Sequence, residues 1–281
     1  MRLISANVID FKYTDPRLYR CKGRPMSCAK CIRTKLLGVL RNCTPSTSLE
    51  TWVRTGWLRD HLPELVPLVG CDQNRYHEYD AWKHTLVVVD RLPSGDPILR
   101  LAGLLHDIGK PATRTRNPDT GDWNFIDHEI LGADMASALL QRLEFPENDS
   151  SRVVHLVRNH YIRYTSEWTD AAVRRWLKRV GSEYLPDLYA LSSADIEGKG
   201  NKRVPGELRL LDDLYHRVYQ PPKVPEKPPK LLAVDGRDVM GHLGLGPGPE
   251  VGRLLRALES AVQADPSLNT REALLALCGR L

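Results

Sequence analysis

The sequence lacks any long hydrophobic run. Its longest apolar stretches, such as residues 86–89 and 102–105, are short, whereas a membrane span needs about 18 or more apolar residues. The first residues soon turn polar, at Asp10, so they contain no signal-peptide core. We therefore expect a cytoplasmic protein without a membrane partner.

Internal repeats are also absent, and alternation with a period of two is scarce between residues 50 and 220. Hydrophobic residues make up 42% of the 281 residues and charged residues 27%, a composition that excludes intrinsic disorder for most of the chain. Amphipathic spacing of helical type prevails instead. We therefore expect an all-α protein.

Positive charge is concentrated at the N-terminus. Residues 1–49 contain ten Lys and Arg residues against two Asp residues, a net charge of +8; since the whole chain carries +5, the remainder carries −3. A basic segment on a mildly acidic body indicates a polyanionic partner such as nucleic acid. A solvated tail is the alternative interpretation.

Four of the six cysteines also fall in this segment, at Cys21, Cys28, Cys31 and Cys43. A disulfide framework is not expected in a cytosolic protein. The spacing Cys28-x2-Cys31 is common in zinc sites, and four thiolates could bind zinc or an iron–sulfur cluster. Free thiols in a small folded extension are the alternative.

Prolines mark the clearest break in the chain. Residues 221–230 contain five prolines, which favours an extended spacer because proline lacks the amide donor that a helix needs. The sequence thus predicts a basic Cys-rich extension (1–49), a helical domain (50–220), a Pro-rich linker (221–230) and a small helical C-terminal region (231–281).

A histidine and an aspartate stand together at the expected end of a core helix. His106 and Asp107 follow the apolar run 99–105, and Gly109 with Pro111 predicts that the helix ends there. Burying both groups without partners would cost several kcal/mol. A divalent metal ion would satisfy both; a hydrogen-bonded pair is the alternative.

Four more potential ligands lie on or at the ends of predicted core helices: His84, His128, His160 and Asp195. Helical folds assemble metal sites in this way, from single inward side chains of several helices. The other five histidines are expected to be structural or exposed: His61, His77, His155, His216 and His242.

The order of these residues resembles the HD superfamily of metal-dependent phosphohydrolases. The flanking motifs extend the likeness to the HD domain of bacterial tRNA nucleotidyltransferases, the CCA-adding enzymes. They are EYDAWKHTL (78–86), LLHDIGKP (104–111), DHEILGA (127–133) and ADIEG (194–198). The resemblance runs from about Glu50 to the C-terminus and implies an HD-domain helical bundle.

Two departures from that family pattern stand out. Asp127 occupies a position where the family usually has glycine. The Gly-Gly or Gly-Ser motif with paired catalytic aspartates for nucleotide addition is missing, and about 49 residues precede the matched region. Without that polymerase head, we do not expect nucleotide addition by this chain alone.

The resemblance implies a centre for one or two divalent ions. His84, His106, Asp107 and Asp195 would bind the first ion; His128 and His160 would help to bind a second, with Asp107 bridging. Nitrogen and oxygen ligands without thiolate suit Mn, Fe, Co, Ni or Mg. Such ions polarise phosphoryl oxygens and activate water at neutral pH.

Three basic residues near these motifs are candidates for substrate contacts. Lys110 would neutralise the phosphate or protonate the leaving oxygen, with Asp107 as its catalytic companion; a surface lysine is the alternative. Arg114 and Arg163 are candidate phosphate-binding residues.

The expected function is hydrolysis of phosphoesters in RNA or nucleotides, such as 2′,3′-cyclic phosphates or tRNA ends. One alternative is a hydrolase of dNTPs or cyclic nucleotides. The other is a non-catalytic RNA-binding partner of a separate nucleotidyltransferase. A basic helix face is compatible with RNA, although such faces are commonly just solvated; it comprises Arg174, Arg175, Lys178 and Arg179.

Overall fold

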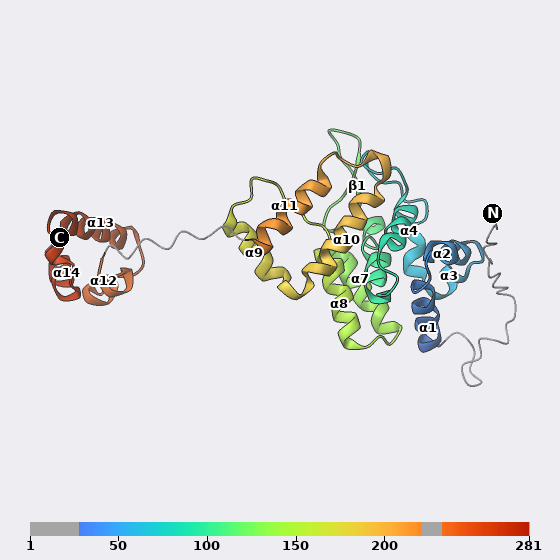
Figure 1. Ribbon diagram of the computed structural model, residues 1–281, viewed down its shortest axis with the longest axis horizontal. Coiled ribbons are helices and arrows are strands. Elements are labelled where there is room, and N and C mark those ends of the chain that lie inside the picture. Colours follow the sequence, from blue (N-terminus) through green and yellow to red (C-terminus); the bar gives the residue numbers. More distant parts are fainter. Residues whose placement is uncertain (1–27, 221–231, 281) are drawn as a thin grey trace, which may run out of the picture. The chain divides into compact units, whose positions relative to one another are not determined.

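The computed structural model describes residues 28–220 and 232–280. They fall into two compact units, one within residues 1–220 and one within residues 221–281 (Figure 1). Cys21, the basic residues before position 28 and the proline-rich stretch 221–230 lie outside the described residues. In the described part, no helix combines the length and apolarity that crossing a membrane requires.

Helices make up nearly all of the larger unit, as the all-α prediction requires. They are α1 (Ala29–Leu40), α2 (Pro45–Arg54), α3 (Trp57–His61), η2 (Pro63–Leu68), α4 (Ala81–Arg91), α5 (Pro97–Leu105), α6 (Lys110–Thr113), α7 (His128–Arg142), α8 (Glu147–Asn159), α9 (Asp170–Val180), η3 (Ser182–Tyr184), α10 (Leu185–Gly198), η4 (Gly200–Lys202) and α11 (Glu207–Tyr219).

One small hairpin was not expected from the sequence. Strands β1 (Arg114–Arg116) and β2 (Trp123–Phe125) pair antiparallel, with Arg114 opposite Phe125 and Arg116 opposite Trp123. The three-residue strands are too short to produce a visible alternation of polar and apolar residues. The hairpin connects α6 to α7 and leaves the all-α architecture intact.

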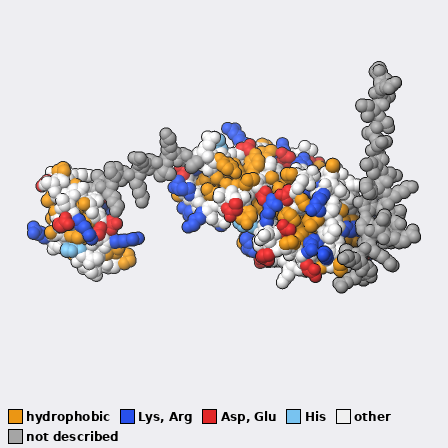
Figure 2. Space-filling model, turned by 60° about the horizontal axis from the view of Figure 1, so that its bottom comes forward, with side chains coloured by type: hydrophobic (Ala, Val, Ile, Leu, Met, Phe, Trp, Pro, Cys, Tyr) orange, Lys and Arg blue, Asp and Glu red, His pale blue; other side chains and the backbone are white. Residues whose placement is uncertain are grey.

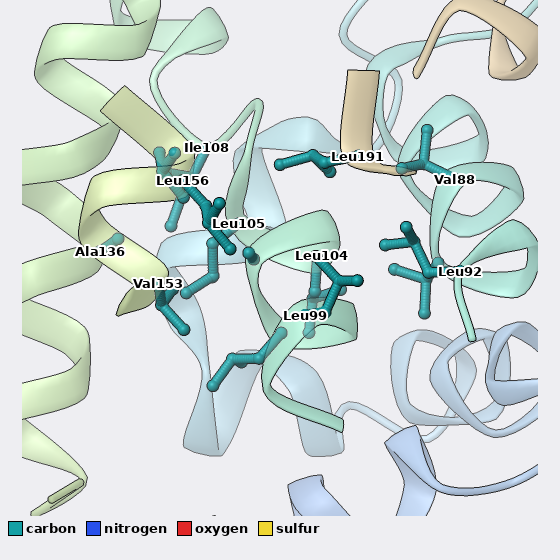
Figure 3. Packing of buried hydrophobic residues seen from close by; sticks show 14 of the residues in the cluster. Val88, Leu92, Leu99, Leu104, Leu105, Ile108, Ala136, Val153, Leu156 and Leu191 are labelled. Atoms are coloured by element: carbon teal, nitrogen blue, oxygen red, sulfur yellow. The ribbon is translucent and has the colours of Figure 1, made fainter. Parts of the chain in front are cut away.

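Helix α5 lies at the centre of the larger unit. Pro97 occupies its first turn, and the Asp96 side chain caps it by accepting the amides of Ile98 and Leu99. All residues from Leu99 to Leu105 are buried, as expected for a helix surrounded by others. Helices α1, α4, α8 and α10 pack against it. Figure 3 shows side chains of α5 between those of α8 on one side and those of α4 and α10 on the other.

The described part of segment 1–49 is helical, although no helix was predicted for this basic Cys-rich extension. Ile32, Leu36 and Leu40 recur at helical spacing on α1 and are buried in the main core. The buried guanidinium of Arg100 donates to the carbonyl of Leu40, which ties α1 to α5. Helix α2 runs across the boundary expected at residue 49. The hydrophobic spacing of α1 was hidden among basic residues.

The described N-terminal cysteines stand at opposite ends of α1. Cys28 caps the helix, with its Sγ 2.7 Å from Sγ of Cys31, whereas Cys43 follows the far end. Twelve helical residues span about 18 Å. Cys43 therefore cannot join Cys28 and Cys31 in one tetrahedral site while α1 is intact. Cys21 lies outside the described residues, and metal binding by the N-terminal cysteines stays a prediction.

The smaller unit contains α12 (Gly236–Leu243), α13 (Pro249–Ala264), η5 (Pro266–Leu268) and α14 (Arg271–Cys278). A capping box between Asp235 and Asp238 begins α12. The three α-helices enclose their own core around Val239, Leu258 and Leu274. The helical pattern predicted for this region is therefore present.

Candidate metal centre

The centre begins where α5 ends. His106 follows the helix directly, and both His106 and Asp107 are almost completely buried. Gly109 lets the chain pass close to the start of α7. A side chain there would not fit, because its Cβ atom would collide with the backbone carbonyl of His128. The chain reversal after α5 thus brings the first turn of α7 against Asp107.

Three histidines share one local arrangement that fixes their orientation. The Nδ1 atom of each lies 2.7 Å from the backbone carbonyl three residues earlier; the pairs are His106 with Gly103, His128 with Phe125, and His160 with Val157. A carbonyl only accepts, so Nδ1 carries the proton and donates it. The Nε2 atom of each ring is then the one that binds a metal ion.

Three ligand atoms, from His84 on α4 and from His106 and Asp107 at the end of α5, form a first cluster, and Asp195 on α10 lies beside it. Nε2 of His84 lies 2.9 Å from Oδ1 of Asp195, 3.3 Å from Nε2 of His106 and 3.5 Å from Oδ2 of Asp107. Nε2 of His106 lies 3.1 Å from the same Asp107 oxygen. Bonds of about 2.1 Å at right angles would place neighbouring ligands about 3 Å apart. The spacings among His84, His106 and Asp107 therefore fit one cation, and Asp195 adjoins it through its contact with His84.

The other oxygen of Asp107 belongs to a second cluster. Its Oδ1 atom lies 3.5 Å from Nε2 of His128 and 3.8 Å from Nε2 of His160. Among the described residues, neither this Oδ1 nor Nε2 of His128 has a hydrogen-bond partner, although both are buried. Such groups are costly unless something satisfies them. A cation bound by both would do so, and Asp107 would then bridge the two clusters.

Electrostatics of the centre favour a cation as well. Burial alone would raise the pKa of Asp107, but His106 and Lys110 hold it well below its ordinary value. Asp195 behaves likewise. Burial alone would raise its pKa, but hydrogen bonds from His106 and His84 lower the pKa well below the usual range. The site therefore contains one buried carboxylate, Asp107, and one half-buried carboxylate, Asp195, that stay ionised and need compensating positive charge.

The pKa values of His160 and His106 are shifted in opposite directions by burial and the surrounding charges. Burial, followed by His106 and His128, lowers the pKa of His160 to about 3, which leaves it a neutral ligand. Burial also lowers the pKa of His106, but Asp107 and Asp195 overcome it and raise the value to about 10. Without an ion, a proton on His106 supplies positive charge; a bound cation would displace that proton.

Lys110 is a buried lysine, not a surface one. Its Nζ atom lies 2.7 Å from Oδ2 of Asp107 and donates to Oε1 of Gln73 at 2.6 Å. A cavity of about 460 Å³ opens above the metal centre, and Lys110 and Arg163 both line it. Lys110 thus faces the same space as the potential ligands.

Arg114 is not among the residues that line this cavity. Its guanidinium lies 3.6 Å from the ring centroid of Trp123 on the hairpin, and its Nη2 is 3.4 Å from Asp72. Of the two arginines expected to bind phosphate, the structure therefore brings Arg163 to the cavity but not Arg114.

Sequence reasoning missed two polar residues of the cavity. His77, expected to be structural or exposed, lines the cavity with its ring edge-on to His84 at 5.3 Å. Burial lowers the pKa of His77 to about 2, so it is a neutral imidazole. Lys199 also lines the cavity and contacts Glu207 at 2.5 Å. Both residues adjoin recognised motifs, and that adjacency was the available signal.

The departure at Asp127 has a conformational explanation. Asp127 caps α7 with a φ of 59°, in the left-handed region, which glycine adopts without strain and aspartate tolerates better than most residues. Its side chain is exposed, and it does not line the cavity. The extra carboxylate therefore faces solvent.

The basic face of α9 lies outside the cavity. Arg174, Arg175, Lys178 and Arg179 are all exposed, while Val173, Trp176 and Val180 face the core. In the described part of the chain, none of the four cations forms an ion pair. Figure 2 shows Lys and Arg side chains gathered at the end of the larger unit where α9 lies.

Comparison with known proteins gives the same region a family. The HD domain matches residues 83–197. The chain is 38% identical to the CC-adding tRNA nucleotidyltransferase of Thermus thermophilus over 86% of its length, and 36% identical to the A-adding tRNA nucleotidyltransferase of Deinococcus radiodurans over 82%. It is 31% identical, again over 82%, to the multifunctional CCA protein of Xanthomonas campestris. These matches cover 54%, 53% and 54% of the relatives, so the chain spans about half of their length.

Proposed function

This chain contains an HD domain and is homologous over that region to tRNA nucleotidyltransferases, and from this premise we propose that it is a metal-dependent phosphohydrolase. Its substrates are phosphoesters of RNA or nucleotides, such as 2′,3′-cyclic phosphates or tRNA ends. The observation that carries the proposal is the convergence of four histidine side chains on Asp107, with Asp195 beside His84, at a cavity.

The two clusters that share Asp107 would hold one or two divalent ions. A bound divalent ion would polarise a phosphoryl oxygen and activate water. The three histidines oriented by carbonyl groups present Nε2 without rearrangement, which keeps the cost of organising the ligands low. The donor set includes no thiolate, so Mn, Fe, Co, Ni and Mg fit it.

Lys110 is the catalytic companion of this centre. Asp107 and Gln73 hold its ammonium at the cavity wall, where it can neutralise a phosphate oxygen or give a proton to the departing oxygen. Arg163, at the same cavity, would bind a phosphate oxygen through its guanidinium.

The relatives support RNA as the substrate class, because their names assign them to tRNA. The size of the cavity favours one alternative, a hydrolase of free nucleotides, since about 460 Å³ is typical of small-molecule sites. A non-catalytic RNA-binding role would leave the buried ligand atoms at Asp107 and His128 unexplained.

The purified chain should be assayed with Mn²⁺ or Ni²⁺ on 2′,3′-cyclic AMP, dNTPs and tRNA with a cyclised end. Replacing His106 or Asp107 by Ala should abolish hydrolysis and lower the bound metal. His242→Ala, an exposed histidine of the smaller unit, should keep both. Full activity in Asp107→Ala would overturn the assignment, and cleavage of dNTPs alone would favour the alternative substrate.

A further inference from the structure

Apolar side chains collect at the cavity of the metal centre although no described segment covers them. Nine large hydrophobic residues are exposed among the described residues, and four of these line this one cavity: Tyr76, Ile126, Tyr161 and Val204. They come from four separate segments of the chain. Exposed apolar residues that gather in one place usually mark a binding surface, so we call these four the apolar rim.

The polar residues of the cavity lie together with this rim. Asp107 and Lys110 line the cavity, and so do Lys199 and Arg163. A matching ligand needs an anionic group for the metal ligands and cations, and a flat apolar group for the rim. Phosphate esters of nucleosides combine these two features in one molecule of this size.

We infer that the apolar rim is a nucleobase subsite in which the base of a nucleoside phosphate stacks on Tyr161. Tyr161 directly follows His160, and its ring centroid lies 5.4 Å from that of His128. It is nevertheless 46% exposed. A large aromatic group that is left half open beside the metal centre contributes little to the core and is available to a ligand.

Arg163 reinforces this assignment. Its guanidinium carbon lies 5.1 Å from the ring centroid of Tyr161, a distance at which cation and ring attract each other. The arginine thus covers one face of the ring and holds it in place, and the base would stack on the face that Arg163 leaves uncovered. Stacking on an aromatic ring tolerates every base because each base has a flat π-face.

This inference rests on the proposed function for the position of the phosphate, and it adds that the base occupies the same cavity. The 3′-terminal nucleotide of an RNA and a free nucleotide offer the same chemistry. Both fit a stacked terminal base, so two ligands separate these sources: adenosine 2′,3′-cyclic phosphate and a short RNA ending in that group.

The test measures binding and hydrolysis by the full chain with Tyr161→Ala, Tyr161→Phe and the wild-type residue. The base-free ligand is glycerol 1,2-cyclic phosphate. Tyr219→Ala is the matched control, because Tyr219 is exposed but does not line the cavity. Equilibrium dialysis with metal-free protein, in which no hydrolysis is expected, gives dissociation constants, and kinetics with Mn²⁺ give KM.

Tyr161→Ala should weaken binding of the adenosine ligand at least about fivefold. Tyr161→Phe and Tyr219→Ala should bind it normally, and the base-free ligand should bind equally to all four proteins. Equal losses for both ligands, or no loss for either, would overturn the nucleobase subsite. The two proposals can also fail separately. If Tyr161→Ala selectively loses binding of the adenosine ligand but the wild-type protein hydrolyses no substrate, the subsite is upheld and the phosphohydrolase is refuted.

If Tyr161→Ala loses affinity only for the free nucleotide, the base in the subsite comes from a mononucleotide. If it loses affinity only for the RNA, the base comes from the terminal nucleotide of an RNA. Either result upholds the stacked base.

Discussion

Gly198 offers a test of how α10 positions a metal ligand without touching the ion. Gly198 is the last residue of α10 and is buried. A Cβ atom placed there would lie 2.8 Å from Cγ2 of Val88 and 3.1 Å from Nδ1 and Cε1 of His84, both on α4. Favourable contact between carbon atoms begins near about 3.5 Å, so Gly198→Ala forces a shift of roughly 0.7 Å.

The shift would act on the first metal cluster. Val88 is β-branched and fully buried, so its side chain has little freedom to turn away. Asp195, one turn earlier on α10, contacts His84 at 2.9 Å. Separation of α10 from α4, or rotation of His84, therefore pulls these two ligands apart.

The expected magnitudes follow from this geometry. Overpacking costs about 1–3 kcal/mol, and the helix preference of alanine over glycine returns up to about 1 kcal/mol, so stability should fall by roughly 0–3 kcal/mol. Affinity for Mn²⁺ should fall about 10- to 100-fold, as when residues behind metal ligands are changed. Titration calorimetry and thermal unfolding measure the two effects.

Gly38→Ala is the matched control. Gly38 is exposed in the last turn of α1, and no atom lies within 4 Å of the position that a Cβ would take there. This variant should gain up to about 0.5–1 kcal/mol with unchanged Mn²⁺ affinity. Wild-type Mn²⁺ affinity in Gly198→Ala would refute the idea that close packing of α10 holds His84 in place.

Three further predictions concern separate parts of the larger unit. Asp107→Asn in metal-free protein should lose roughly 3–5 kcal/mol in urea unfolding, because it leaves the buried ammonium of Lys110 without its carboxylate; adding Lys110→Met should recover most of the loss, and no recovery would contradict the pairing. Partial burial raises the pKa of Asp96, but Arg152 and two backbone amides lower it below its ordinary value. A carboxylate whose pKa is lower in the folded than in the unfolded state stabilises the fold at pH values above the unfolded pKa. The loss in free energy of unfolding caused by Asp96→Asn should therefore shrink below about pH 4. A loss that does not change with pH would argue against the ion pair. Alanine at both Arg175 and Lys178 should weaken tRNA binding and reduce the slope of log K against log salt by about 1.4–1.8, and an unchanged slope would exclude α9 from the RNA contact.

The sequence located the candidate ligands because each stands at a recognisable point of a helix. His106 follows the apolar helix α5 directly, and His160 follows the amphipathic helix α8. A buried polar group at the end of such a helix is visible without coordinates. Their convergence was a prediction from family likeness. It depends on how α4, α5, α7, α8 and α10 pack, which periodicity alone does not specify.

The cavity itself could not be predicted in this way. Tyr76, Ile126, Tyr161 and Val204 lie in connecting segments, where no periodicity assigns a side chain to one face. Such residues become neighbours only after the helices have fixed the ends of each loop. Arg114 shows the opposite case, a residue that was expected at the site and does not lie there. Its closeness in sequence to Lys110 suggested a phosphate contact, but in the hairpin its guanidinium stacks on Trp123.

Helix α1 was missed for a different reason. Its apolar positions have regular helical spacing, but the segment was interpreted from its charge and its cysteines, as a polyanion-binding extension or a solvated tail. Lys35 has its ammonium 4.6 Å from the ring centroid of Trp57, so a residue counted only as surface charge also packs on an aromatic group.

The bonds from Nδ1 of His106, His128 and His160 all reach back three residues. Each ring is thus aimed by a four-residue segment of its own chain, and not by a distant neighbour. Sequence drift on remote surfaces should leave the aim of all three rings unchanged. A one-residue insertion or deletion inside 103–106, 125–128 or 157–160 would turn a ring away at once, however well the remaining helices still pack.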